Sequence, residues 1–488
     1  MPVKLSETQL EAILAQQIEL AKSHDSKERE PNRSKALDYY FGSMDKYVPA
    51  ETNRSKVVSR DVADTIGWLM PEFMRIYTAS GRMFVAEPSE EEDLEYSDQV
   101  TDGLNYVFWK ENEGYQIVYD GTWDALMHGD GIVKTFWDET PIYGPAKFHD
   151  ALTEDERAML LQDDDVEVLA STENAPAAAP DPTQQQPMLP GAPMDPMAGA
   201  MMRQPEMAPP QTTYDLKVRR KKADGRYVVT VIPPEDFLID ADAINLEDAA
   251  FKAHWQRKTR SDLVAMGYDK ADVWAIPEAA RNETPEAQAR RLFINSDATD
   301  MSMQLVDYFE CFVMVDADGD GVAEMVRACY AGGTNGKLLD WEIWEDEDPF
   351  DNIPCEPIPH RYGARSVADE EIDVQDVKTV LTRQLLNGVY WATNPQRFAK
   401  GKIHNPDQLD NPTFGGTIFG DANATVENLE SPPVGEIALA GIQYMDEVSS
   451  RRTGVNSQSM ALDPETLQNQ SATANNNAMA ASRSQPEL

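Results

Sequence analysis

Cysteine, histidine and long apolar runs are all scarce in this chain of 488 residues. The three cysteines, Cys311, Cys329 and Cys355, are an odd number without metal-ligand spacing, so we expect neither a disulfide framework nor a cysteine zinc site. A reducing cytoplasm suits such a composition. The N-terminus lacks an apolar signal core and no run of about 18 apolar residues occurs, so neither secretion nor membrane insertion is predicted.

The sequence motifs of common enzyme classes are also missing. The six histidines lie far apart without an HExxH motif, and GxSxG is absent. The nearest approach to a nucleotide-binding P-loop is AGGTNGKL at 331–338, where Ala331 replaces the first glycine and Leu338 replaces the hydroxyl residue that binds magnesium. The sequence therefore predicts a protein that is not an enzyme and uses no cofactor.

Basic residues are few, with 43 Lys and Arg against 85 Asp and Glu, which gives a net charge of −42. This balance argues against high-affinity wrapping of nucleic acid, which depends on neutralising phosphates. One stretch departs from it, because residues 377–404 contain no acidic residue at all. Its five basic residues are our candidates for contact with DNA or a partner: Lys378, Arg383, Arg397, Lys400 and Lys402.

Hydrophobic periodicity predicts an α+β protein of several domains. Helices are expected in the first 130 residues, notably over 5–22 and 57–77, and the acidic block at 89–98 fits the first turns of another. Strands are expected over 129–139 and in a hairpin over 213–233 with Ala-Asp-Gly as its turn. Between them, residues 171–212 hold ten of the 32 prolines and six of the 21 methionines, which predicts a disordered loop.

The motif VDADGDGVAEMVR places three aspartates, Asp316, Asp318 and Asp320, at alternate positions before a glycine. A calcium-binding EF-hand needs a glutamate at its twelfth position, where this chain has Arg327. The flanking residues alternate as strands, so we expect a tight hairpin turn and no metal site. Weak calcium binding at these aspartates or Glu324 is the alternative, and it would suit a calcium-dependent adhesin or hydrolase accessory.

The C-terminal third predicts a helix from Ser366, whose capping box with Asp369 marks its start, to the stop at Asn394-Pro395. An apolar stripe runs along it, formed by Val374, Val377, Leu381, Leu385 and Val389. Short strands are expected next, around 398–403 and in ATVENL at 424–429. A second helix over 434–453 has Val434, Ile437, Met445 and Val448 inward, and Asp463-Pro464 begins a third.

This order of helix, small β-containing subdomain, helix, loop and helix resembles the portal proteins of tailed bacteriophages, most closely those of short-tailed phages such as phage P22. Six stretches carry the resemblance in order along the chain: SRDVADTIGWLMPEFMRIYTASGRMFVAEP, VIPPEDFLID, VDADGDGVAEMVR, HRYGARSVADEEIDVQDVKTVLTRQLLNGVYWATNPQRF, NPTFGGTIF and RRTGVNSQSMALDPETLQNQSATANNNAMAAS.

The resemblance implies the portal fold, with a helix-rich wing, a β-containing wing insert, two stem helices flanking a small clip, a tunnel loop and a long helix. The expected parts are an N-terminal helical wing region (1–130), a β-rich wing region (131–365) with its loop (171–212), stem helix 1 (366–394), the clip (395–432), stem helix 2 (433–453), the tunnel loop (454–464) and the start of a long wing helix (465–488). The chain ends at ASRSQPEL inside that helix, so we expect no crown in it, as a short version or a truncation.

As a portal, the chain would form a ring of twelve copies at one capsid vertex of the virion, assembled in the host cytoplasm and without membrane contact. Double-stranded genome DNA would pass through its channel during packaging and ejection. The terminase large subunit and later the head-tail adaptor proteins would dock on the clip, and capsid and scaffold proteins would surround the ring. The alternative is another phage head or scaffold protein that does not line a DNA channel.

The resemblance also assigns places to the candidate residues. Lys378 and Arg383 would lie on stem helix 1, off its apolar stripe, facing either the channel or a neighbouring subunit. Arg397, Lys400 and Lys402 would lie in the clip, facing DNA, the terminase or an adaptor. The tunnel loop would project uncharged residues into the channel, namely Val455, Asn456, Ser457, Gln458, Ser459 and Met460.

Overall fold

The computed structural model describes residues 5–79, 81–88, 94–163, 165–174, 212–279, 286, 300–333, 336–411, 413, 415–429 and 434–455. Contacts divide the chain into two compact units, one formed by residues 1–135 and 229–488 and the other by 136–228. Helices and strands occur in both units, which confirms the α+β expectation. The predicted tunnel loop beyond Val455, the helix after Asp463 and most of the predicted 171–212 loop lie outside the described residues.

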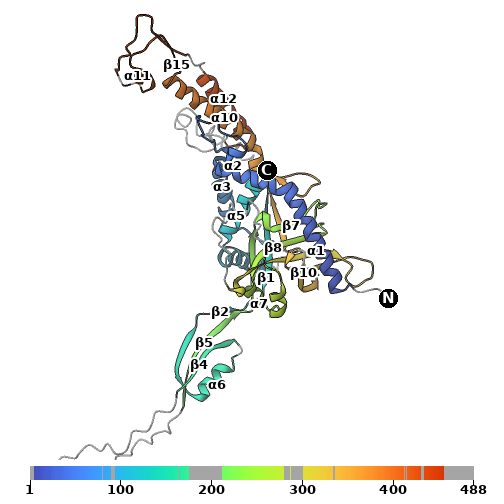
Figure 1. Cartoon of the computed structure of the whole chain (residues 1–488). Coiled ribbons are helices and arrows are strands. Elements are labelled where there is room, and N and C mark those ends of the chain that lie inside the picture. Colours follow the sequence, from blue (N-terminus) through green and yellow to red (C-terminus); the bar gives the residue numbers. More distant parts are fainter. Residues whose placement is uncertain are drawn as a thin grey trace, which may run out of the picture. The chain divides into compact units, whose positions relative to one another are not determined.

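The N-terminal part of the first unit is helical, as predicted (Figure 1). Its elements are α1 (Glu7–His24), the π-helix η1 (Asp25–Arg29), α2 (Glu30–Phe41), the 3-10 turn η2 (Met44–Lys46), α3 (Asp61–Thr78), α4 (Leu94–Tyr106), the π-helix η4 (Val107–Glu111) and α5 (Gly114–His128). Ser6 and Gln9 form a capping box at the start of α1.

Helix α1 packs on an antiparallel five-stranded sheet of order β11-β10-β9-β8-β7. The strands are β7 (Phe237–Ile239), β8 (Phe251–Thr259), β9 (Leu305–Val315), β10 (Glu324–Ala331) and β11 (Lys337–Ile343). Leu10, Leu14 and Ile18 of α1 are buried against this sheet, because their spacing puts them on one face of the helix. Helices α7 (Arg260–Ala265) and α8 (Lys270–Ala275) pack on another part of the sheet. The 3-10 turns η5 (Pro234–Asp236) and η6 (Met301–Met303) contact β8 and α7, respectively.

The predicted hairpin over 213–233 is wrong, although both of its strands exist. Strand β5 (Thr213–Ala223) belongs to a sheet with β2 (Ile142–Tyr143), β3 (Lys147–Leu152) and β4 (Val166–Asn174). Strand β6 (Arg226–Ile232) instead joins β1 (Asp130–Asp138) and β12 (Phe350–Pro354) in a second sheet. The Ala-Asp-Gly turn therefore connects strands of two different sheets, and each strand pairs with partners farther away in sequence.

The second unit, residues 136–228, is small and has a thin core. Its sheet is formed by β2 to β5, and helix α6 (Glu154–Leu161) contacts β5. Leu216 and Val218 of β5 are buried, whereas Phe148 and Met159 are 70% and 74% exposed. Cations lie over aromatic rings here, as with Arg219 above Tyr143 at 3.9 Å.

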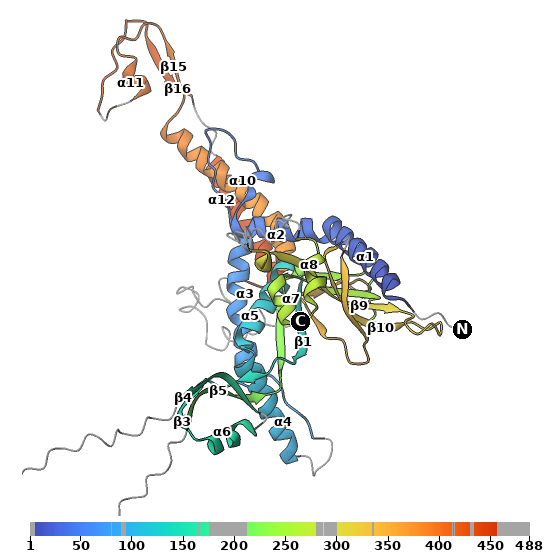
Figure 2. The same cartoon turned by 60° about the horizontal axis from the view of Figure 1, so that its bottom comes forward.

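Two long helices of the first unit, α10 (Val367–Thr393) and α12 (Val434–Thr453), pack side by side (Figures 1 and 2). Gly441 allows this approach, since a Cβ atom there would lie 2.9 Å from Leu381 Cδ1. Between them lies a small subdomain, which we call the tip subdomain (residues 397–428). It holds β15 (Arg397–Lys400), α11 (Asp407–Asp410) and β16 (Thr425–Asn428). The two-residue strands β13 (Glu356–Pro357) and β14 (Ala364–Arg365) precede α10.

Both helices lie where the sequence predicted them, with the capping box of Ser366 and Asp369 at the start of α10. The predicted inward stripes are partly wrong. Val374 is buried, but Val377 and Val389 are 42% and 51% exposed, and Ile437 of α12 is 74% exposed. The reason is that the buried face of α10 is largely polar, a property that a hydrophobic pattern does not detect.

Candidate functional site

The buried face of α10 carries a polar residue at every fourth position: Glu371, Gln375, Thr379, Arg383 and Asn387. Four residues advance an α-helix by about 6 Å and return close to the same face. The first four side chains in this row are at most 7% exposed. Buried polar groups require hydrogen-bond partners, and α10 finds most of its partners in the N-terminal part of the chain.

These partners lie in an extended stretch and the first two residues of α3, which together we call the anchored segment (residues 55–62). Asn387 Oδ1 accepts a hydrogen bond from the Ser55 amide at 2.8 Å, and Thr379 Oγ1 accepts one from the Ser59 amide at 3.1 Å. Gln375 Oε1 accepts from the Val62 amide at 3.0 Å. Two extended residues span about 6.6 Å, so the two steps from Ser55 through Val57 to Ser59 each match one helical step. The last step, from Ser59 to Val62, takes three residues. This pairing explains why α3 begins at Asp61, later than the predicted residue 57.

Arg383 belongs to the same row and is 7% exposed. Its Nε donates to the Val57 carbonyl oxygen at 2.9 Å, and its NH1 donates to the Val48 carbonyl oxygen at 2.8 Å. The guanidinium group therefore fixes two backbone positions of its own chain. The sequence analysis offered the channel or a neighbouring subunit as the surroundings of Arg383 and did not consider this arrangement.

Lys378 also has partners within the chain. Its ammonium group forms ion pairs with Asp61 of α3 and, at 2.6 Å, with Asp446 of α12. Burial alone would lower the pKa of Lys378, but the hydrogen bonds that it donates to these two carboxylates raise it, so the lysine stays charged. Lys378 thus joins three helices at the base of the α10–α12 pair.

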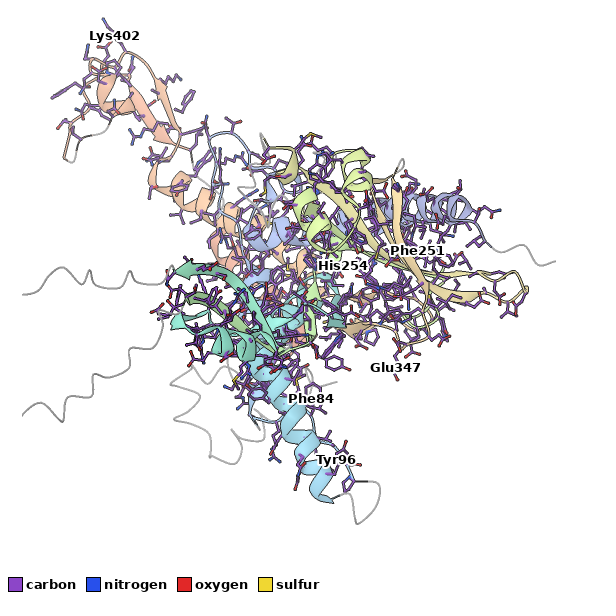
Figure 3. All side chains as sticks on the ribbon, turned by 90° about the horizontal axis from the view of Figure 1, so that it is seen from below. Phe84, Tyr96, Phe251, His254, Glu347 and Lys402 are labelled. Atoms are coloured by element: carbon purple, nitrogen blue, oxygen red, sulfur yellow. The ribbon has the colours of Figure 1, made fainter. Side chains whose placement is uncertain are left out.

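The three remaining candidates lie in the tip subdomain. Arg397 is partly buried, and its NH1 donates to the Leu409 carbonyl oxygen at 2.8 Å. Lys400 and Lys402 are exposed, and neither has a carboxylate within ion-pair distance in the described part of the chain. Lys402 can be seen among the side chains of the tip in Figure 3. The structure therefore separates the basic stretch into two internally bound residues on α10 and three accessible ones on the tip.

Comparison with protein families shows to which family the chain belongs. The model of the family described as Phage SU10 portal protein matches residues 10–488, which is nearly the whole chain. The chain belongs to this family. No curated protein matches it. Portal proteins are structural, non-enzymatic components of the phage particle, which agrees with the lack of enzyme motifs in this sequence.

Within this portal chain, the structure describes only Gly454 and Val455 of the predicted tunnel loop (454–464), and Val455 is the first of its six candidate residues. That residue is partly buried, packs against the core formed by α2, α3, α5 and α10, and donates its amide to Thr453 Oγ1 at 3.3 Å. The other five predicted loop residues, 456–460, lie outside the described part of the chain, and their place in a channel stays a prediction.

The aspartate-rich turn of the portal chain connects β9 and β10, which pair as a hairpin, as predicted. Carboxylate oxygens of Asp316, Asp318, Asp320 and Glu324 lie within 4.8 Å of one another. They also hold the turn together, since Asp316 accepts from the amides of Gly319 and Gly321 at 2.6 and 3.0 Å. The hairpin therefore has a structural use for these carboxylates whether or not calcium binds.

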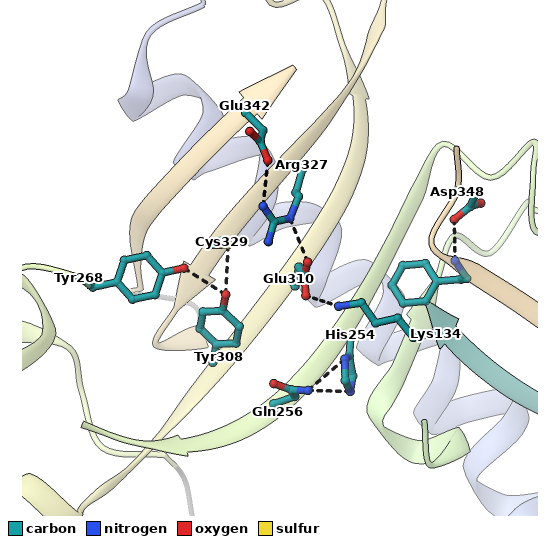
Figure 4. A network of polar contacts seen from close by, with 11 residues as sticks. Lys134, His254, Gln256, Tyr268, Tyr308, Glu310, Arg327, Cys329, Glu342 and Asp348 are labelled. Carbon is teal, nitrogen blue, oxygen red and sulfur yellow. Dashed lines mark hydrogen bonds and ion pairs between the residues drawn. The ribbon is translucent and has the colours of Figure 1, made fainter. Parts of the chain in front are cut away.

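A second polar network of the portal chain lies in its five-stranded sheet (Figure 4). Glu310 of β9 forms an ion pair with Lys134 of β1 and accepts from Arg327 Nε at 2.9 Å. Burial alone would raise the pKa of Glu310, but these two cations lower it. Burial, reinforced by Lys134, lowers the pKa of nearby His254 to about 3, so this histidine is neutral in the folded protein.

No helix in the described ranges of this portal chain is long and apolar enough to span a membrane.

Proposed function

We propose that this portal chain assembles as a ring of twelve copies at one capsid vertex and that genome DNA passes through the ring during packaging and ejection. In this proposal α10 and α12 are the two stem helices and the tip subdomain is the clip. The terminase large subunit docks on the tip during packaging, and head-tail adaptor proteins replace it afterwards. Capsid and scaffold proteins contact the ring as the particle assembles in the host cytoplasm.

The observation that carries this proposal is the α10–tip–α12 arm, whose large apolar side chains are left uncovered in a single chain. Trp391 near the end of α10 is 40% exposed, and Ile437 and Tyr444 of α12 are 74% and 61% exposed. In the tip, Phe398 and Phe419 are 55% and 62% exposed. Two helices and a two-stranded sheet are too few to bury these groups, whereas identical arms arranged around an axis cover them.

The negative charge of the chain is consistent with a channel that does not bind the DNA passing through it. Multiplying −42 by twelve gives −504 for the proposed ring, which repels DNA on average. Lys400 and Lys402 supply two exposed positive charges per copy on the tip, without an ion-pair partner among the described residues, and they suit DNA phosphates or an acidic surface of the packaging machinery. Lys378 and Arg383 contribute to such contacts only if their partners within the chain are released.

Electron microscopy of the purified full chain tests this proposal. Twelve-fold rings with a central hole are the expected result, and class averages report the symmetry directly. Sheets, or particles without a central opening, would favour a head or scaffold protein that does not line a DNA channel. Persistent monomers at high protein concentration would count against self-assembly.

A further inference from the structure

Glu371 is the member of the polar row on α10 that has no backbone partner. Its side chain is completely buried, with 0% exposure, in the second turn of the helix. Neither carboxyl oxygen makes a hydrogen bond of normal geometry within the described part of the chain. The other four members of the row each bind a main-chain group, so Glu371 has a different role.

Two neighbouring helices present charged groups to this carboxyl group. From α3 it faces Asp61, which is 7% exposed and accepts a hydrogen bond from Ser59 Oγ at 2.6 Å. From α12 it faces Arg452 and the Ser449 hydroxyl group, and from its own helix it faces Lys378.

The cations around Glu371 are already occupied. Lys378 binds the carboxylates of Asp61 and Asp446. Arg452 binds Asp373 through two hydrogen bonds of 2.6 and 3.1 Å and also donates to the Glu370 carbonyl oxygen at 2.7 Å. An ionised Glu371 would therefore be a buried negative charge beside another carboxylate, without a cation of its own.

Burial and the charge of Asp61 raise the pKa of Glu371 to about 7, although Ser449, Lys378 and Arg452 act to lower it. When the helices separate, the carboxyl group meets water and its pKa returns to the ordinary value of 4.5. Between about pH 4.5 and pH 7, Glu371 is therefore protonated in the packed state and ionised in the open state. Because the packed-state pKa is the raised one, the stability of the packing is greatest at low pH and falls as pH rises through about 7.

We propose that Glu371 is a proton-operated lock at the base of the α10–α12 pair, which keeps α10 packed against α3 and α12 when neutral and releases it when ionised. If α10 and α12 are the stem helices of a DNA-conducting ring, as proposed above, this lock regulates the wall of the channel. The lock itself is a property of one chain and does not depend on that assignment.

Amide hydrogen exchange of the full-length protein, measured by mass spectrometry at pH 6 and pH 8 and corrected for intrinsic exchange rates, tests the lock. For peptides covering the first half of α10 and the last turns of α12, the opening equilibrium should rise about tenfold from pH 6 to pH 8. In Glu371→Gln, whose side chain is neutral at both pH values, that rise should disappear. Glu436→Gln, an exposed position on α12, is the matched control and should behave like the unmodified protein.

A second variant checks the cause. Asp61→Asn removes the like charge that faces Glu371, so the midpoint of the pH response should move to lower pH. An equal pH response in the unmodified protein and in Glu371→Gln overturns the lock. Electron microscopy of the same samples records ring formation separately. If no rings form but Glu371→Gln still abolishes the pH response, the proposed assembly is contradicted and the lock is supported.

Discussion

Replacing Arg383 with methionine tests whether the basic stretch on α10 serves the fold of its own chain. The substitution keeps most of the side-chain volume but leaves the carbonyl oxygens of Val48 and Val57 without their charged donors. Hydrogen bonds to charged groups contribute about 1.5–3 kcal/mol each, so two are worth roughly 3–6 kcal/mol. Part of this loss is offset, because the variant no longer buries a guanidinium group whose NH2 has no hydrogen-bond partner among the described residues. We expect a net loss of roughly 2–3 kcal/mol.

Local hydrogen exchange is the appropriate assay, because the lost contacts hold one segment and not the whole chain. The predicted loss corresponds to exchange about 30- to 150-fold faster in peptides covering residues 48–60 of Arg383→Met. Lys402→Met is the matched control, since it removes one positive charge from the same basic stretch without touching that segment. Unchanged exchange at 48–60 in Arg383→Met would refute the anchoring role and return Arg383 to the candidates for contact with DNA or another subunit.

Three further predictions concern pH, the tip and calcium. Because the pKa of His254 is lowered to about 3 from an ordinary 6.5, the unfolded chain takes up a proton at this histidine first as pH falls, which should cost about 2 kcal/mol of stability between pH 6.5 and 4.5. Denaturant unfolding at the two pH values should show a smaller loss for His254→Gln, and an identical loss would contradict the buried neutral state. Joint replacement of Lys400 and Lys402 by glutamate should leave rings intact but weaken association with DNA or the terminase about tenfold in a binding assay. Wild-type binding in that variant would exclude these lysines as contacts. Calorimetry with calcium should give no saturable heat, because backbone amides already donate to four of the six aspartate oxygens. Saturable heat that is lost in Asp318→Asn would establish a metal site.

The element order of the C-terminal third was predictable because its signals are local. Ser366 with Asp369 caps α10, Asn394-Pro395 ends it, and the bounds of α12 agree with the expected 434–453. The β9–β10 hairpin was predictable for the same reason, since its turn is specified by a run of aspartates and glycines. These features follow from neighbouring residues and need no knowledge of distant contacts.

The errors have a common physical origin in contacts between residues distant in sequence. Strand β6 pairs with β1 and not with its neighbour β5, because tertiary pairing outweighs a favourable turn. The polar face of α10 is buried because an extended segment more than 300 residues earlier supplies its hydrogen bonds. The spacing of four between Gln375, Thr379, Arg383 and Asn387 was visible in the sequence, but polar residues at helical spacing are usually interpreted as a solvated face.

The contacts between α10 and the anchored segment also determine how this part of the molecule resists force. The segment runs antiparallel to the helix, with Asn387, Arg383, Thr379 and Gln375 meeting successively later residues. A pull along the helix axis loads these hydrogen bonds together, in shear, whereas a pull across it would break them one at a time. The geometry therefore makes α10 mechanically stiffest along its own axis, the direction in which a load on the tip subdomain is transmitted to the helices at its base.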